Sequence, residues 1–272
     1  MGRRERRGKS RISTDEVAVL VRQAAREELL PRFSRVERQH KADGSILTQA
    51  DLAMHQRLEQ EFAQSWPQIG FLSEEMPLAE QQALLASGSP IWCLDPLDGT
   101  NNFAAGVPLF SVSLALIRDG ESVMGIVYDP TRDESFIAQK GEGAHLNAVP
   151  LRSKRLDVGL HQAVALLDYK RLRADLRETI MRQPPFSSQR NLGSCALEWG
   201  WMAAGRSNIC LHGGQYLWDY AAGCLILAEA GGRSCTLHGD PVFEPSLKPR
   251  SVILALDTKL FDEWRSWLAE HL

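Results

Sequence analysis

The sequence predicts a mixed α/β (α+β) fold. Apolar residues recur at helical spacing over 14–35, short apolar runs separated by turn residues follow over 110–139, and helix-like and strand-like segments alternate beyond Pro150. With 272 residues, 44% of them hydrophobic, the chain can bury a sizeable core. We expect one large domain or two closely packed lobes, 1–150 and 151–272.

Two helices are expected first. Thr14 at a cap position precedes a helix that extends to about Arg35, and a second helix covers 51–65. Thr48 and Asp51 match a capping box with Asp in place of Glu. The apolar or half-apolar residues at helical spacing are Val17, Leu20, Val21, Ala24, Leu29, Leu52, His55, Leu58 and Phe62.

Strands follow these helices. Two short apolar runs, 69–72 and 91–94, are suited to buried strands, and Pro96 should end the second of them. Turn-forming stretches then separate three further apolar runs, which predicts an antiparallel meander closed by 141–144. The three strands of this meander are expected at 110–117, 122–128 and 134–139.

The second half of the chain alternates helices and strands. A helix that begins near Asp219 is apolar on almost every side, so it should be buried, and Gly231 and Gly232 should end it. Trp264 and Trp267 lie in a last helix and are expected in the core. The other expected elements are strands at 163–167 and 208–211 and helices at 170–181 and 194–204.

The segment 91–103 carries the main chemical signal. Asp95 and Asp98 stand together where a strand ends, Gly99 permits an unusual backbone geometry, and Thr100 can open a helix whose free N–H groups face an anion. Carboxylates and phosphate repel each other unless cations lie between them, and oxygen ligands favour Mg²⁺. The pattern indicates a metal-dependent phosphoester site, with a simple Asx turn as the alternative.

Further acids support the metal site. Glu74 or Glu75 follows the apolar run 69–72 and can stand at a strand end, and Asp219 is the N-cap or first-turn acid of the buried helix. A buried acid needs a partner, and a metal is a natural one. The seven histidines and five cysteines show no zinc-type or nucleophile spacing, which argues against a covalent enzyme intermediate.

Four segments in order resemble the inositol monophosphatase family of Mg²⁺-dependent, lithium-sensitive phosphatases. The family segment Asp-Pro-(Ile/Leu)-Asp-Gly-Thr-x-Asn-Phe is intact from Asp95 to Phe103, and Trp-Asp-x-Ala-(Ala/Gly) leads to Glu-Ala-Gly-Gly from Trp218 to Gly232. A Glu-Glu pair and a Thr-x-(Ala/Thr)-Asp segment lie upstream, so the resemblance covers 41–232. It implies a layered α-β-α-β-α sandwich with metals between two lobes and, by analogy alone, a homodimer.

The resemblance also implies the role of each site residue. A first Mg²⁺ would be bound by Glu74, Asp95 and the carbonyl of Leu97. A second would be bound by Asp95, Asp98 and Asp219, and a weaker third by Glu74, giving two to three ions. Gly99 and Thr100 would bind the phosphate.

The implied reaction is attack of an activated water on the phosphate. The Thr100 hydroxyl, oriented by Asp51, would help this water lose its proton, so these two residues and Glu74 are the catalytic candidates. A second metal would stabilise the departing alkoxide in an in-line displacement. The residues expected to contact the substrate are Asp98, Ser194, Cys195, His212 and Asp219.

The substrate is expected to be a small phosphate monoester such as myo-inositol monophosphate or a related polyol or sugar phosphate. Inositol-selective members usually carry Glu where this chain has His212, which puts inositol preference in question. Fructose 1,6-bisphosphate, histidinol phosphate and 3′-phosphoadenosine 5′-phosphate are the competing substrates.

Composition favours an enzyme of the cytoplasm. No window approaches the roughly 18 consecutive apolar residues of a membrane span, and no apolar region follows the basic start as in a signal peptide. Residues 1–10 carry five basic groups and one acidic group, and we expect a disordered basic tail there. A nucleic-acid partner is not expected, because the remaining chain is acidic. The non-enzyme alternative is an RNA- or transcription-associated accessory protein that uses this tail.

Overall fold

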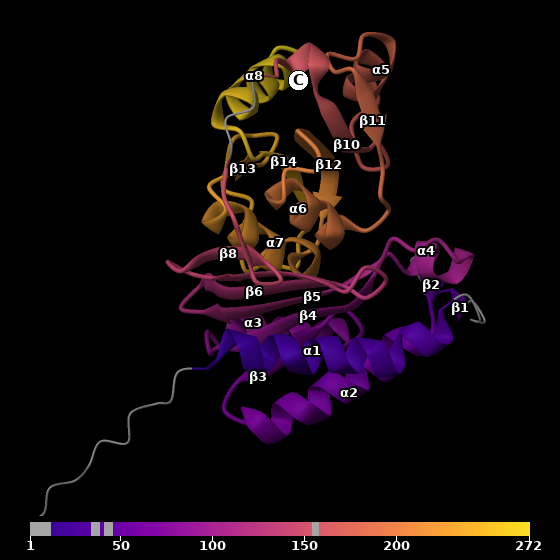
Figure 1. Ribbon diagram of the computed structural model, residues 1–272, viewed down its shortest axis with the longest axis vertical. Helices are drawn as coiled ribbons and strands as arrows, with labels where there is room; N and C mark the ends of the chain where they lie inside the picture. Colours follow the sequence, from indigo (N-terminus) through magenta and orange to yellow (C-terminus); the bar gives the residue numbers. More distant parts are fainter. Residues whose placement is uncertain (1–11, 34–38, 41–45, 154–157) are drawn as a thin grey trace, which may run out of the picture.

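The computed structural model describes residues 12–33, 39–40, 46–153 and 158–272. Five layers stack along the long axis of the molecule in the order α-β-α-β-α, as the resemblance implies (Figure 1). The outer layer at one end contains α1 (Thr14–Glu28) and α2 (Gln49–Ser65), and the outer layer at the other end contains α5 (Ala174–Arg182) and α8 (Thr258–Ala269). The middle layer contains α6 (Cys195–Ala203) and α7 (Leu217–Glu229).

Two sheets separate these helical layers. The first has the strand order β3-β4-β5-β6-β7-β8-β9, is antiparallel from β4 onward and has β3 parallel to β4. Its strands are β3 (Gly70–Ser73), β4 (Ile91–Asp98), β5 (Ser111–Arg118), β6 (Glu121–Asp129), β7 (Glu134–Gln139), β8 (Gly143–Leu146) and β9 (Val149–Leu151). The predicted antiparallel meander is therefore confirmed as β5, β6 and β7.

The second sheet has the order β11-β10-β12-β14-β13 and mixes parallel and antiparallel pairs. Its strands are β10 (Val164–Asp168), β11 (Ser188–Arg190), β12 (Ile209–Gln215), β13 (Arg233–Cys235) and β14 (Arg250–Ala255). Short elements complete the fold: the pair β1 (Gln39–His40) and β2 (Ile46–Leu47), α3 (Leu78–Ala86), α4 (Thr100–Ala105), and two 3₁₀ turns, Leu30–Arg32 and Leu160–Gln162.

The first helix differs from its prediction at both ends. Ser13, rather than Thr14, is the N-cap, because its hydroxyl accepts a hydrogen bond from the Glu16 N–H. The α-helix ends at Glu28, and a 3₁₀ turn that contains Pro31 follows it. Arg35, the loop 41–45 and the basic segment 1–10 lie outside the described residues.

The prediction that Pro96 ends its strand is wrong. Strand β4 continues to Asp98, and its pairing with β5 shifts register between Asp95 and Asp98. Such an irregularity tolerates a residue without an N–H, which is why a proline fits inside this strand. The bulge also places both aspartates on the same short stretch of backbone.

Three other boundaries were predicted wrongly. The first sheet does not close at 141–144, because β8 and β9 add two more strands to it. Helix α5 begins at Ala174, since the preceding residues from Lys170 form a turn in which Asp168 accepts a hydrogen bond from the Lys170 N–H. Strand β12 extends beyond Leu211 to Gln215 through a further shift of register.

The middle helices share one core with both sheets. A single cluster of buried apolar residues contains Trp199 of α6, Ala222 of α7, Ala115 of the first sheet and Leu254 of the second. Trp264 is fully buried in a second cluster beneath α8, as predicted, while Trp267 is partly buried beside it. The division into lobes near residue 150 stays a prediction.

Candidate active site

Three aspartates converge where the middle helices meet the first sheet. Carboxylate oxygens of Asp95, Asp98 and Asp219 all lie within 4.8 Å of one another. The β4 bulge supplies the first two, and α7 supplies the third from its first turn, where Asp219 accepts a hydrogen bond from the Tyr216 N–H at 2.8 Å. Asp219 is thus the first-turn acid of its helix, one of the two positions predicted for it.

The cluster strongly disfavours three full negative charges. Burial raises the pKa of Asp95 well above its usual range, and the charges of Glu74, Asp98 and Asp219 raise it further. Burial likewise raises the pKa of Asp219, with Asp98 as the next cause. A cation among these oxygens would offset this repulsion, so the cluster is suited to a divalent ion.

Hydrogen-bond donors from the second half of the chain fix the orientation of Asp98. Its Oδ2 accepts from Ser194 Oγ at 2.5 Å and from the Ala196 N–H at 2.7 Å, and its Oδ1 accepts from the Cys195 N–H at 3.1 Å. These donors come from the first turn of α6 and its N-cap. Burial still raises the pKa of Asp98, although the three donors oppose the rise.

Gly99 and Thr100 form the turn between β4 and α4. Gly99 is the N-cap of α4 and has φ of 94°, which is a left-handed conformation that a side chain would disfavour. The Thr100 hydroxyl lies 3.2 Å from Asp51 Oδ1 and 3.0 Å from the Leu97 carbonyl oxygen, and it can donate to either. The predicted pairing of Thr100 with Asp51 is therefore present in the structure.

Asp51 is buried behind this turn. Its Oδ2 accepts hydrogen bonds from the Thr48 backbone N–H at 2.7 Å and from Thr48 Oγ1 at 2.5 Å, while Thr48 Oγ1 accepts from the Ala50 N–H. The predicted capping box is thus real, and it leaves Asp51 Oδ1 facing Thr100. One aspartate serves both the helix cap and the active-site turn.

One pocket of about 230 Å³ contains nearly all of the predicted site residues. This volume suits a substrate smaller than a drug-sized ligand. The predicted residues that line it are Glu74, Asp95, Leu97, Asp98, Gly99, Thr100, Ser194, Cys195, His212 and Asp219. Asp51 is not a lining residue and reaches the pocket only through Thr100. Of the two glutamates left open by the sequence, Glu74 lines the pocket and Glu75 does not.

His212 lines the pocket next to Cys195 and Asp168. Its Nδ1 accepts a hydrogen bond from the Gly214 N–H at 3.0 Å, and its Nε2 lies 3.6 Å from both Asp168 Oδ2 and Cys195 Sγ. Burial raises the pKa of the Cys195 thiol well above its usual range, with Asp219 as the next cause, which disfavours the thiolate form.

Sequence reasoning missed several residues of this pocket. Glu198 on α6 accepts a hydrogen bond from the Leu192 N–H at 3.0 Å, and Asn102 Nδ2 donates to the Leu192 carbonyl at 2.6 Å, so side chains hold the N–H and the carbonyl of Leu192, two residues before Ser194. Burial raises the pKa of Glu198 to about 8. An acid inside a short apolar helix was the signal that could have revealed Glu198. The other lining residues outside the predicted site set are Asn101, Asp168, Lys170, Arg171, Asn191, Gly193, Gly214, Tyr216 and Trp218.

Comparison with known proteins agrees with this geometry. The model of the Inositol monophosphatase family matches residues 11–270. An inositol-1-monophosphatase of Mesorhizobium japonicum is 34% identical over 213 residues, which cover 73% of this chain and 75% of that protein. A protein of Pasteurella multocida named Nus factor SuhB is 35% identical over 204 residues, covering 73% and 74%.

The fold is shared with a solved structure as well. The crystal structure of the extragenic suppressor protein suhB from Bartonella henselae superposes with a TM-score of 0.81 at 27% identity, covering 95% of this chain and 99% of that one. Within the described ranges, no helix combines the length and the apolar character that crossing a bilayer requires.

Proposed function

The chain belongs to the inositol monophosphatase family and is a phosphomonoesterase, and from this premise we propose that it hydrolyses a polyol or sugar phosphate with the help of Mg²⁺. The observation that carries the proposal is the gathering of Asp95, Asp98 and Asp219 within 4.8 Å at the wall of one small pocket. An Asx turn, the alternative considered from sequence, does not account for Asp219, which comes from a different layer of the fold.

The donor set fits a hard divalent cation. Two oxygens that bind one Mg²⁺ at about 2.1 Å lie at most about 4.2 Å apart. The carboxylate oxygens of the cluster lie within 4.8 Å of one another, so a small side-chain adjustment brings them to that spacing. We assign Glu74, Asp95 and the Leu97 carbonyl to one ion, Asp95, Asp98 and Asp219 to another, and Glu74 to a weaker third. When bound, Mg²⁺ supplies positive charge that offsets the carboxylates and the phosphate and favours loss of a proton from water.

Thr100 and Asp51 are positioned to handle that proton. As the Thr100 oxygen accepts a proton from the attacking water, its own proton can pass to Asp51 Oδ1, 3.2 Å away. The two hydrogen bonds from Thr48 hold Asp51 still during this transfer. The N–H groups of the turn at Gly99 and Thr100 would bind the phosphate at the start of α4.

Ser194 and Ala196 complete the site by holding Asp98 against the metal-ligand cluster. Because these donors belong to the middle helical layer and Asp98 to the first sheet, the site assembles only when the layers pack together. We further propose that Cys195, His212 and the rest of the rim contact the leaving alcohol and set the choice of substrate.

A phosphate-release assay tests the proposal. Myo-inositol 1-phosphate, fructose 1,6-bisphosphate, histidinol phosphate and 3′-phosphoadenosine 5′-phosphate should be assayed with Mg²⁺ and again with chelator. We expect release of phosphate from at least one ester, only with Mg²⁺, and loss of it in Asp219→Asn with the fold retained. Equal release in chelator, or wild-type rates in Asp219→Asn, would reject the assignment of the metal site.

The names of relatives favour a second candidate function. A relative named Nus factor SuhB supports the hypothesis of an RNA- or transcription-associated accessory protein. RNA binding that is lost when residues 1–10 are deleted, in a protein without phosphatase activity, would favour this function over the enzyme. Cytoplasmic location and a homodimer remain predictions that fit either function, whereas lithium sensitivity is a prediction for the enzyme alone.

A further inference from the structure

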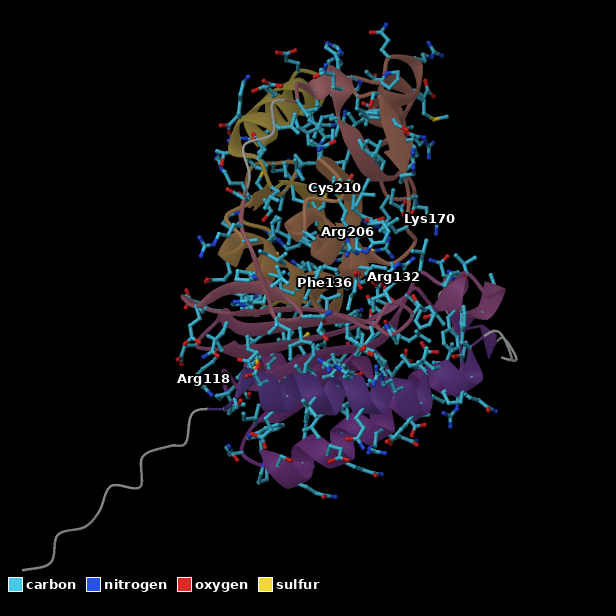
Figure 2. The ribbon with its side chains drawn as sticks, in the orientation of Figure 1. Arg118, Arg132, Phe136, Lys170, Arg206 and Cys210 are labelled. Atoms are coloured by element: carbon cyan, nitrogen blue, oxygen red, sulfur yellow. The ribbon has the colours of Figure 1, made fainter. Side chains whose placement is uncertain are left out.

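The rim of the pocket carries two basic residues that the metal-site assignment does not use. Lys170 and Arg171 lie in the turn between β10 and α5, and both line the pocket that contains Thr100 and Asp219. Figure 2 shows Lys170 at the edge of the molecule, on the same side as α4. The positive charge of Arg171 is close enough to Asp219 to lower the pKa of that carboxyl, although burial, the largest cause, raises it.

Strand β12 is shaped to receive Arg171. A Cβ at Gly213 would lie 2.2 Å from the Arg171 carbonyl carbon, and a Cβ at Gly214 would lie 3.1 Å from its Cδ. Only a residue without a side chain allows the β10–α5 turn to approach β12 this closely at Gly213. The Gly-Gly pair at the irregular end of β12 therefore determines where Arg171 sits.

The guanidinium of Arg171 is held in one place. Its Nη1 donates to the Gly214 carbonyl at 2.7 Å, and its Cζ lies 5.0 Å from the centroid of the Tyr216 ring. Tyr216 in turn stacks on Trp218 with centroids 5.3 Å apart and the rings inclined by 17°. An arginine fixed by stacking and by a backbone carbonyl loses little freedom when it binds a ligand.

The remaining donors of Arg171 are not taken up by an acid. Within the part of the chain that the structure describes, no carboxylate pairs with its guanidinium, whereas the neighbouring Arg173 pairs with Asp175. The nearest acid along this turn, Asp168, accepts a hydrogen bond from the Lys170 N–H and faces His212. The rim is therefore positive at Arg171 and Lys170, and Asp168 faces His212 beside them.

We propose that Arg171, assisted by Lys170, binds a second anionic group of the substrate. This inference rests on the proposed function, because the ester phosphate must occupy the turn at Gly99 and Thr100 for the second anion to reach the opposite rim. The preferred substrates are then phosphate monoesters that also carry a phosphate or a carboxylate, rather than esters of neutral polyols. Guanidinium groups bind both kinds of anion through paired N–H donors.

Three pairs of substrates test the proposal, because the members of each pair differ by one anionic group. They are fructose 1,6-bisphosphate with fructose 1-phosphate, 3′-phosphoadenosine 5′-phosphate with adenosine 3′-monophosphate, and 2-phosphoglycerate with glycerol 2-phosphate. We expect kcat/KM to be higher, in at least one pair, for the member with two anionic groups, and the pair that responds identifies the source of the second anion. If none of the three pairs shows a preference, the proposal is overturned.

Substitution of Arg171 gives the second readout. Arg171→Gln should lower kcat/KM for the member with two anionic groups by roughly 10- to 100-fold, mainly through KM, which is the loss expected for one charge-assisted contact. The member that carries only the ester phosphate should change by less than about threefold, since it makes no such contact. Arg173→Gln, in the same turn and already paired with Asp175, should change neither. An equal loss for both members would show that Arg171 only supports the pocket.

Failure of this inference can be separated from failure of the proposed function. If no ester is hydrolysed with Mg²⁺, the proposed function fails. The inference is then tested by calorimetry, which compares the binding of fructose 6-phosphate and of fructose to the Mg²⁺-loaded protein. Tighter binding of fructose 6-phosphate that Arg171→Gln abolishes supports the anion subsite, and equal binding of both sugars overturns it. Hydrolysis without any preference for the second anion overturns the inference alone.

Discussion

Replacing Asp95 by Asn should stabilise the protein in chelator and remove most of its stabilisation by Mg²⁺. Two unit charges 4.8 Å apart repel by about 3.5 kcal/mol at an effective dielectric constant near 20. Because burial and the neighbouring carboxylates raise the pKa of Asp95, part of this repulsion is already relieved by protonation. We therefore expect a gain of about 1–2 kcal/mol, or roughly 2–8 °C in melting temperature.

The response to Mg²⁺ should change in the opposite direction. Binding at 100 times the dissociation constant stabilises a protein by about 2.7 kcal/mol, so wild type should gain roughly 5–10 °C. Asp95→Asn should keep only a small part of that gain in melting temperature. Its amide oxygen can still accept the hydrogen bond that the Leu97 N–H donates to Asp95 at 3.0 Å, so the local backbone should be retained. Thermal melts with MgCl₂, with NaCl of equal ionic strength and with chelator measure these effects.

Asp129→Asn is the matched control. Asp129 is also fully buried, but it accepts hydrogen bonds from Thr131 and pairs with Arg132 at 2.7 Å, outside the pocket. The same substitution there should lower the melting temperature in every buffer and leave the Mg²⁺ response intact. If Asp95→Asn is less stable than wild type in chelator, or if both respond equally to Mg²⁺, the repulsive cluster is not the basis of metal binding.

Three further predictions follow from single contacts. Ser194→Ala removes the 2.5 Å hydrogen bond to Asp98 and should weaken Mg²⁺ binding about 10-fold by calorimetry; unchanged affinity would contradict this. Glu198→Gln keeps the acceptor for the Leu192 N–H, and burial raises the pKa of Glu198 to about 8 in wild type. Wild type should therefore lose stability relative to the Gln variant as pH rises from 4.5 to 8, which urea titrations measure. A difference in unfolding free energy that stays constant with pH would contradict this prediction. Gly213→Ala should cost about 1–3 kcal/mol in urea unfolding and should selectively weaken binding of esters with a second anionic group. Wild-type stability together with wild-type binding would show that the β10–α5 turn adapts.

Local sequence signals were sufficient to predict much of the cluster that we propose as the metal site. Asp95, Asp98 and Gly99 follow one another around a turn, so their proximity follows from covalent connection alone. The capping box at Thr48 and Asp51 likewise involves only one helical turn, and the structure contains it as predicted. Asp219 could be placed beside them only because the family resemblance related two distant segments, since its contact with Asp98 spans more than a hundred residues.

Irregular strands were the main source of error, for a physical reason. A proline in a regular strand removes a ladder hydrogen bond, so Pro96 correctly signals a break in regular pairing. Sequence alone does not say whether the chain then leaves the sheet or shifts register and continues. Here it continues to Asp98, because a bulge against β5 accommodates the missing N–H.

The rim of the pocket illustrates a limit of a different kind. The position of Arg171 depends on close contact with Gly213, which lies 42 residues further along the chain in a strand of the second sheet. Neither residue is unusual within its own segment, and a surface arginine before a helix is most simply explained by solvation. Its contacts with Gly213, Gly214 and Tyr216 distinguish it from Arg173, which pairs with Asp175 close by in the sequence. On our proposal, substrate choice depends on this long-range contact between the β10–α5 turn and β12, whereas the proposed metal ligands Asp95 and Asp98 lie on one short stretch of β4, so the two properties can change independently.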